Sequence, residues 1–243
     1  MTHKTKGIVL RTVKYGETSL VVTILTELFG VQAYMVNGVR SSKRSASKAN
    51  LFQPGAILDM MVYHHEQKTI QRIKEFGWSV IYQNVLTDVI KNSIALYLVE
   101  LLYKSIKQPE QNEALFYFTE DVLLHLDAAD KIVTANVPLY FALHLPYFLG
   151  FRMNDDYEPG QSILDLQEGS FIADRPLHQF FMEGENALLT SQLLKVMQLS
   201  ELSDFRLHHD VRRNLLHYYH SYYTLHIPDF GEMKTLAVLQ DVL

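Results

Sequence analysis

The sequence predicts an α+β protein of more than one domain, with a five-stranded β module first and a mainly α-helical module after it. In the first 80 residues, five short segments rich in β-branched residues are separated by turn signals every 8–12 residues. This pattern is typical of a small β-sandwich or barrel. After Trp78 the apolar residues recur at the i, i+3, i+4 spacing of helices. We therefore place the domain boundary between residues 80 and 81.

The expected strands follow from alternating apolar residues bounded by turns. Asn37-Gly38 and Pro54-Gly55 are the strongest turn signals. The predicted strands are Lys6–Val13, Ser19–Glu27, Val31–Val39, Ala56–His65 and Thr69–Trp78.

The helical module contains five longer periodic segments and a short tail that is either a helix or extended. The expected helices are Asn84–Ile106, Asn112–Ala129, Val133–Phe151, Gly184–Leu199 and His208–Ile227. Pro146 is expected to kink or end the third helix, because proline has no N–H and clashes with the preceding turn. The turn-rich stretch 152–176 has room for a short hairpin that pairs Ile163–Asp165 with Ser170–Ile172.

Composition excludes several classes of function. The chain has no cysteine, which excludes disulfides, thiolate nucleophiles and cysteine-based metal sites. Neither a signal peptide nor an apolar run of the roughly 18 residues that cross a membrane is evident in the sequence. We expect a cytoplasmic protein without a membrane partner.

Charge is distributed unequally between the two modules. Residues 1–80 contain eleven Lys and Arg against five Asp and Glu, whereas residues 81–243 contain eleven against twenty-two. The net charges are therefore +6 and −11. Such asymmetry indicates a basic binding module beside a module with another task.

The most basic segment is Gly38–Phe52, which holds four cations, four serines and no acidic residue. A solvated connection is one interpretation, and a clamp for the phosphates of a nucleic acid is the other. Further cations lie on the first strand and the last hairpin. The predicted DNA contacts are Lys6, Arg11, Lys14, Arg40, Lys43, Arg44, Lys48, Lys68, Arg72 and Lys74.

Motifs of catalysis are missing from the sequence, which has no P-loop, GxGxxG, GxSxG, HExxH or EF-hand pattern. The pair Asp155-Asp156 is interpreted as a solvated turn. His217 and His220 are three residues apart on an expected helix and could share a metal, but no third ligand is visible. We predict no catalytic residue, no metal and no cofactor. The aromatic stretches LFYF and LPYFLGF are interpreted as core, with a groove for a partner peptide as the alternative.

The opening of the chain resembles the RecO family of bacterial recombination mediators. The resemblance rests on an "IVL…YGE" strand and turn, a strand ending in "T…G", and a "GVR" turn before a basic loop. The matching residues are Ile8, Val9, Leu10, Tyr15, Gly16, Glu17, Thr26, Gly30, Gly38 and Arg40 with the Ser/Lys/Arg run after it. The segment Leu145–Phe151 resembles the middle region of the family.

The resemblance implies a fold and a set of partners. The fold is an N-terminal OB barrel followed by a helical domain. The implied activities are binding of single- and double-stranded DNA, annealing of complementary strands, and loading of the RecA recombinase together with RecR. The acidic C-terminal tail of single-strand-binding protein would dock on the helical domain. Many members carry a four-cysteine zinc element where this chain has the cysteine-free insertion 152–176, so we predict no structural zinc.

Two other functions remain open at this point. One is a helical protein-interaction scaffold whose barrel binds protein or RNA rather than DNA. The other is a hydrolase or metalloenzyme that uses the cluster of histidines at positions 208, 209, 217, 220 and 226. A steep salt dependence of binding distinguishes DNA contacts from the first, and stoichiometric metal in the purified protein would support the second.

Overall fold

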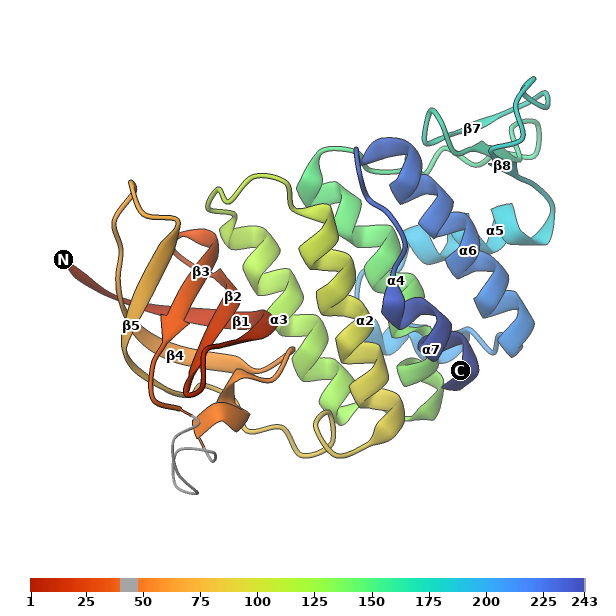
Figure 1. The fold of residues 1–243 in the computed structure, drawn as a ribbon. Coiled ribbons are helices and arrows are strands. Elements are labelled where there is room, and N and C mark those ends of the chain that lie inside the picture. Colours follow the sequence, from red (N-terminus) through yellow and green to blue (C-terminus); the bar gives the residue numbers. More distant parts are fainter. Residues whose placement is uncertain (40–47, 243) are drawn as a thin grey trace. The chain divides into compact units, whose positions relative to one another are not determined.

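The computed structural model describes residues 1–39 and 48–242. The chain forms two compact units, Met1–Asp127 and Ala128–Leu243. The first unit contains the strands of the β module and the first two long helices. The second contains the remaining helices and a small sheet (Figure 1).

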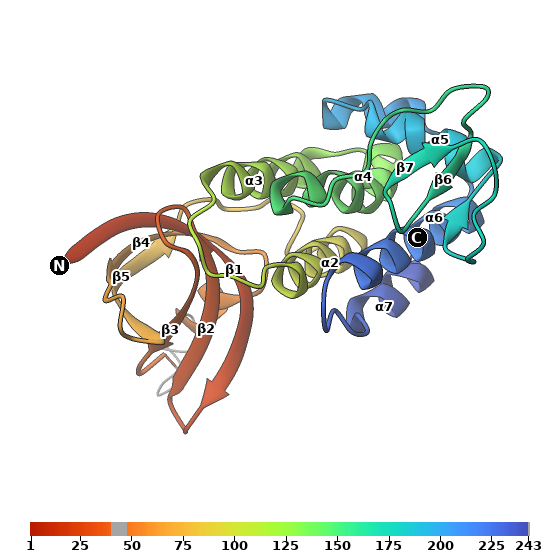
Figure 2. The same cartoon turned by 90° about the horizontal axis from the view of Figure 1, so that it is seen from above.

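The first unit begins with a closed barrel of five strands, which confirms the predicted fold class (Figure 2). The strands are β1 (Thr2–Tyr15), β2 (Ser19–Thr26), β3 (Gly30–Val36), β4 (Ile57–Tyr63) and β5 (Ile70–Trp78). Their order around the barrel is β1-β2-β3-β5-β4. The parallel pairing of β3 with β5 closes the barrel, and every other neighbouring pair is antiparallel. The first strand begins four residues earlier than the apolar pattern predicts, because Thr2–Thr5 pair with the end of β4.

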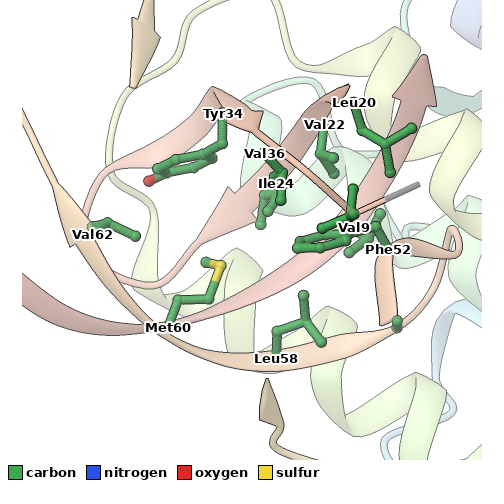
Figure 3. Close-up of a cluster of buried hydrophobic side chains, with 12 residues drawn as sticks. Val9, Leu20, Val22, Ile24, Tyr34, Val36, Phe52, Leu58, Met60 and Val62 are labelled. Carbon is green, nitrogen blue, oxygen red and sulfur yellow. The ribbon is translucent and has the colours of Figure 1, made fainter. Parts of the chain in front are cut away.

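Alternation along each strand fills the barrel. Side chains of a strand point to opposite faces in turn, so every second residue faces inward. The inward set is apolar and almost entirely buried, and it includes Val9, Leu20, Val22, Ile24, Tyr34, Val36, Leu58, Met60 and Val62. Figure 3 shows these side chains converging inside the barrel, with Phe52 from the short 3-10 helix η1 (Asn50–Phe52) among them. Burial of these side chains from water is the main term that stabilises the barrel.

Two β-bulges adjust the outer face of the barrel. In β1 the register shifts between Val9 and Arg11, so that Leu10 is the extra residue. In β5 it shifts opposite Met61 and Val62, so that Lys74 is the extra residue. A bulge changes which face the following side chains occupy. After its bulge, β1 therefore places Arg11 and Val13 on the outer face.

Two helices complete the first unit. They are α2 (Val89–Ser105) and α3 (Glu113–Ala128), and α2 packs on β1. Asp88 caps the start of α2 by accepting a hydrogen bond from the Lys91 N–H at 2.9 Å. Ile8 and Leu10 on the outer side of β1 are buried.

The second unit is built on α4 (Lys131–Leu149). Its other elements are α5 (Glu185–Leu194), the 3-10 helix η2 (Leu199–Asp204), α6 (His209–His226) and α7 (Lys234–Val242). By length and hydropathy α4 is long and apolar enough to cross a membrane, in contrast to the prediction that no run reaches that length. It is nevertheless 67% buried inside the protein, and it packs on η2, α5 and α6 as a core helix does.

Pro146 does not end α4, and the helix continues to Leu149 before Gly150 terminates it in a left-handed conformation. The carbonyl that Pro146 leaves without a helical donor belongs to Ala142, and it accepts a hydrogen bond from the Tyr223 hydroxyl at 3.0 Å. This substitute donor lies on α6, far away in sequence, so no local pattern indicates that the helix can continue past Pro146.

The insertion after α4 contains the predicted hairpin. Strand β6 (Ile163–Asp165) pairs with β7 (Ser170–Ile172), and β8 (Phe181–Met182), which the sequence did not predict, joins on the other side of β6. Asp165 is nearly buried, and its carboxylate accepts from the Gln167 N–H and lies 3.3 Å from His178 Nε2. Packing and these polar contacts hold the small sheet.

Candidate nucleic-acid interface

One row of side chains runs around the outer face of the barrel across all five strands. In the pairing register, Val13 of β1 lies opposite Val21 of β2, and Val21 lies opposite Met35 of β3. Met35 pairs with Arg72 of β5, which is opposite Tyr63 of β4. Directly paired residues point to the same face, so the five form a continuous row. Val13 and Tyr63 are 44% and 39% exposed, which makes this row an accessible apolar surface with one arginine.

A second row lies beside the first. Arg11, Thr23, Ala33 and Ile70 are paired in turn on β1, β2, β3 and β5. The Arg11 guanidinium donates to the Tyr103 hydroxyl at 3.3 Å and lies 5.8 Å from the centre of that ring. Tyr103 of α2 therefore holds Arg11 in place at one side of the outer face.

Lys6 is already engaged within the protein. Its ammonium lies 2.9 Å from Oε1 of Glu120 on α3, whose side chain is only 9% exposed. The hydrogen bond to Glu120 raises the pKa of Lys6, and burial opposes this only in part. The contact links β1 to α3, and a DNA contact by Lys6 stays a prediction.

Two predicted cations lie near the end of the barrel from which the basic segment departs. Lys14 is exposed and pairs with Leu20, so it points to the other face of β1 from Arg11 and Val13. Lys48 is exposed immediately before η1. Both flanks of the basic segment are anchored, because Val39 and Phe52 are buried in the barrel core. Arg40, Lys43 and Arg44 lie outside the described residues.

The last three predicted cations lie on or before β5. Arg72 belongs to the outer row, and Lys68 lies in the turn before it. Lys74 is the bulge residue, 3.7 Å from the sulfur of Met61 and 3.8 Å from Glu75. The structure thus brings Lys68 and Arg72 to one place on the barrel and directs Lys74 to a different set of neighbours.

Sequence reasoning found the cations of this surface but missed its apolar part. Val21, Met35 and Tyr63 were assigned to strands, and nothing in their local pattern marks them as neighbours. Only the register of three strand pairings, including the parallel β3–β5 pair, brings them into one row.

Acidic groups gather on the side of the barrel that α3 covers. Glu27 at the end of β2 accepts a hydrogen bond from the Tyr117 hydroxyl, and this contact raises the pKa of Tyr117 to about 12. Glu120 is occupied by Lys6. These two carboxylates are thus paired or hydrogen-bonded within the unit. The outer row contains one charged side chain, the Arg72 guanidinium, and this group suits an anion.

His217 and His220, considered above as a possible metal pair, are not in the candidate ligand group found among the described residues. Among the described residues, the group with ligand atoms within 4.8 Å of one another is His208, His209 and Asp210, and all three are exposed. The His220 ring lies against Phe230 at a centroid distance of 5.9 Å. His208 serves as the N-cap of α6.

A second candidate surface is a pocket of about 490 Å³ in the second unit. It is lined by Leu143, His144, Tyr147, Arg152, Met153, Asn154, Asp155, Leu194 and Met197. Tyr147 and Met197 are 62% and 79% exposed, and the Arg152 guanidinium lies 5.9 Å from the centre of the Tyr147 ring. Burial lowers the pKa of His144, against the opposing hydrogen bond to the Leu193 carbonyl, so this imidazole is neutral at pH 7. The pocket combines an apolar floor with one exposed guanidinium. Its one carboxylate, that of Asp155, accepts from the Ser191 hydroxyl at 3.0 Å and lies 3.7 Å from the Lys195 ammonium.

Comparison with known proteins gives one consistent result. Residues 1–80 match the family model "Recombination protein O N terminal", and residues 86–235 match "Recombination protein O C terminal". The chain is 35% identical to the DNA repair protein RecO of Bacteroides fragilis over 244 residues, covering 100% of this chain and 99% of that protein. Its identity is 33% to the RecO of Phocaeicola vulgatus and 34% to that of Flavobacterium psychrophilum, again over 100% of this chain and 99% of each relative.

Proposed function

Since the chain belongs to the RecO family of DNA repair proteins, we propose that it binds single- and double-stranded DNA through its barrel and anneals complementary strands without catalysing a reaction. The single observation that carries this proposal is the outer row, in which apolar side chains lie beside Arg72 and no member is acidic. Its general role in DNA repair and recombination comes with the family.

The proposed mechanism divides the work between charge and pairing. Lysines and arginines neutralise phosphates without regard to sequence and release counterions. Two strands that are both held on such a surface repel each other less, and the bases are left to select their partners. The proposed contacts are the ten cations named above, with Lys6 exchanging Glu120 for a phosphate when DNA is bound.

We propose that the chain divides into two functional parts between residues 80 and 81. The barrel takes DNA, and the acidic helical part docks proteins. The proposed partners are RecR and the tail of single-strand-binding protein, and through them the RecA filament. We propose that the protein acts in the cytoplasm, on the nucleoid.

The pocket beside Tyr147 suits the acidic tail of single-strand-binding protein. An acidic peptide needs a cation, and an apolar residue within it needs a hydrophobic cavity. Arg152 supplies the first, and Leu143, Leu194 and Met153 supply the second. We expect Arg152→Glu to lose binding to a synthetic tail peptide. Lys131→Glu is the control and is expected to bind as the wild type does, because Lys131 lies at the start of α4 and does not line the pocket.

The first test of the proposal is fluorescence anisotropy with a labelled single strand across a salt series. The variant changes Arg40, Lys43, Arg44 and Lys48 to Ala. We expect tight binding by the wild type, and weaker binding with a shallower salt slope by the variant, because fewer counterions are released. A wild type that binds neither single strands nor duplex would reject the proposal in favour of the protein-interaction scaffold.

A further inference from the structure

A pocket of about 360 Å³ opens on the outer face of the barrel where β4 turns into β5. It is lined by Tyr63, His65, Lys68, Ile70, Gln71 and Arg72. Its volume lies near the lower end of the range of about 300–1,000 Å³ that small-ligand pockets occupy. All its walls come from one hairpin, so the pocket exists without any contribution from elsewhere in the chain.

The turn that forms the pocket is fixed by a buried side chain. Gln71 is only 2% exposed. Its amide oxygen accepts from the His65 N–H at 3.0 Å, and its amide nitrogen donates to the carbonyls of His65 and Lys68, each at 2.8 Å. The Lys68 N–H donates to the His65 carbonyl at 3.0 Å. Because the turn is already ordered, a ligand does not have to order it on binding.

The pocket wall combines a flat apolar surface with positive charge. Tyr63 and Ile70 are 39% and 42% exposed, although both are large hydrophobic residues. Arg72 is directly opposite Tyr63 in the β4–β5 register. Within residues 1–39 and 48–242, the side chains of Lys68 and Arg72 make no hydrogen bond or ion pair. A ligand that satisfies this wall has a flat ring system and an anionic group close to it.

We propose that this pocket receives one unpaired nucleotide of a DNA single strand, with the base against Tyr63 and Ile70 and its phosphate at Lys68 and Arg72. The inference rests on the proposed DNA binding and deepens it. A base inside a duplex is stacked on both faces and cannot lie against Tyr63. The pocket therefore adds affinity for single strands alone, whereas the cations of the barrel act on single strands and duplex alike.

The test compares Tyr63→Ala with Tyr63→Phe on three labelled probes. The probes are an oligothymidylate, a duplex of the same length, and a single strand of the same length made of abasic residues. Stacking of a base on an aromatic ring contributes about 1–3 kcal/mol, so Tyr63→Ala is expected to weaken oligothymidylate binding by about 5- to 150-fold. Tyr63→Phe keeps the ring and is expected to retain wild-type affinity. On the duplex and on the abasic strand, Tyr63→Ala is expected to bind as the wild type does.

The outcomes separate this inference from the proposed function. Equal losses on all three probes, or no loss on any of them, would overturn the nucleotide pocket while leaving DNA binding intact. Failure of the wild type on every probe would reject the proposed function itself. Lys131→Ala, which removes an exposed side chain outside the barrel, is the control variant and is expected to bind all three probes as the wild type does. Thermal melts verify that each variant is folded.

Discussion

The Tyr223 hydroxyl of α6 donates to the Ala142 carbonyl of α4, the acceptor that Pro146 leaves without an N–H. Tyr223 and Ala142 are both buried, so water cannot replace the hydroxyl as the donor to the Ala142 carbonyl. A proline inside a core helix is thereby compensated by a side chain from another helix of the same unit.

Tyr223→Phe is expected to lower the free energy of unfolding by about 1–3 kcal/mol, because the buried carbonyl is left unsatisfied. Adding Pro146→Ala restores a backbone N–H at that position, so the double variant is expected to recover part of the loss. Thermal denaturation measures both changes. Tyr218→Phe on the same helix is the control, and equal effects of Phe at positions 218 and 223 would contradict the assignment.

Asp127 near the end of α3 holds the segment that leaves the barrel. Its carboxylate accepts from the backbone N–H groups of Gln83, Asn84 and Val85 at 2.7–2.9 Å. Burial alone would raise the pKa of Asp127, but these donors and Lys91 outweigh it and hold the pKa below the usual value. The contribution to stability is therefore complete above about pH 4 and is lost as the pH falls through the lowered pKa.

Asp127→Asn is expected to cost about 1–3 kcal/mol at pH 7, and the difference from the wild type is expected to shrink below about pH 4. Urea denaturation between pH 3 and pH 7 measures this. Asp121→Asn is the matched control, since that carboxylate is on the same helix and its side chain is 61% exposed. A deficit for Asp127→Asn that is constant across the whole pH range would argue against the charge as the cause.

Gly30 at the start of β3 is required for two reasons. Its φ is +60°, which disfavours other residues, and an added Cβ would lie 2.1 Å from the Glu110 carbonyl oxygen, which belongs to the backbone. Gly16 has a similar φ of +58° with nothing within 4 Å of such a Cβ.

Gly30→Ala is therefore expected to lower the melting temperature clearly more than Gly16→Ala. Both variants carry the left-handed strain of about 1 kcal/mol, and only the first displaces the loop at Glu110. Differential scanning calorimetry provides the comparison. Indistinguishable melting temperatures would mean that the approach of Glu110 to the barrel does not contribute to stability.

Lys6 and Glu120 form an ion pair, and removing only the lysine is expected to cost more stability than replacing both residues. Lys6→Ala leaves a nearly buried carboxylate without its partner and is expected to destabilise more than Lys6→Ala combined with Glu120→Gln. The hydrogen bond to Glu120 raises the pKa of Lys6 above its ordinary value of 10.5, so this stabilisation is complete below that value and is lost as the pH rises through the raised pKa. Thermal melts at pH 7 and pH 11 measure it. The salt slope of DNA binding is expected to change less for Lys6→Ala than for Arg72→Ala.

The barrel strands were predictable because their period-2 pattern and their turns are local signals. The compensation of Pro146 inside α4 was not, because the donor is Tyr223, which no local pattern connects to it. The cations of the candidate interface could be predicted from charge alone. Their arrangement could not be predicted, because it depends on strand register. Which side chains share a face is decided by the bulges at Leu10 and Lys74 and by the parallel β3–β5 pairing. The ion pair of Lys6 depends on a helix more than a hundred residues later in the chain.

Closure of the barrel also restricts how other molecules can attach to it. A sheet with a free edge can accept a further strand by main-chain hydrogen bonding, which leads to peptide capture or to self-association. Here each barrel strand has a neighbour on both sides, so this mode of attachment has no edge to use. The barrel must therefore be recognised through its side chains, and single substitutions can change its ligands without disturbing the sheet.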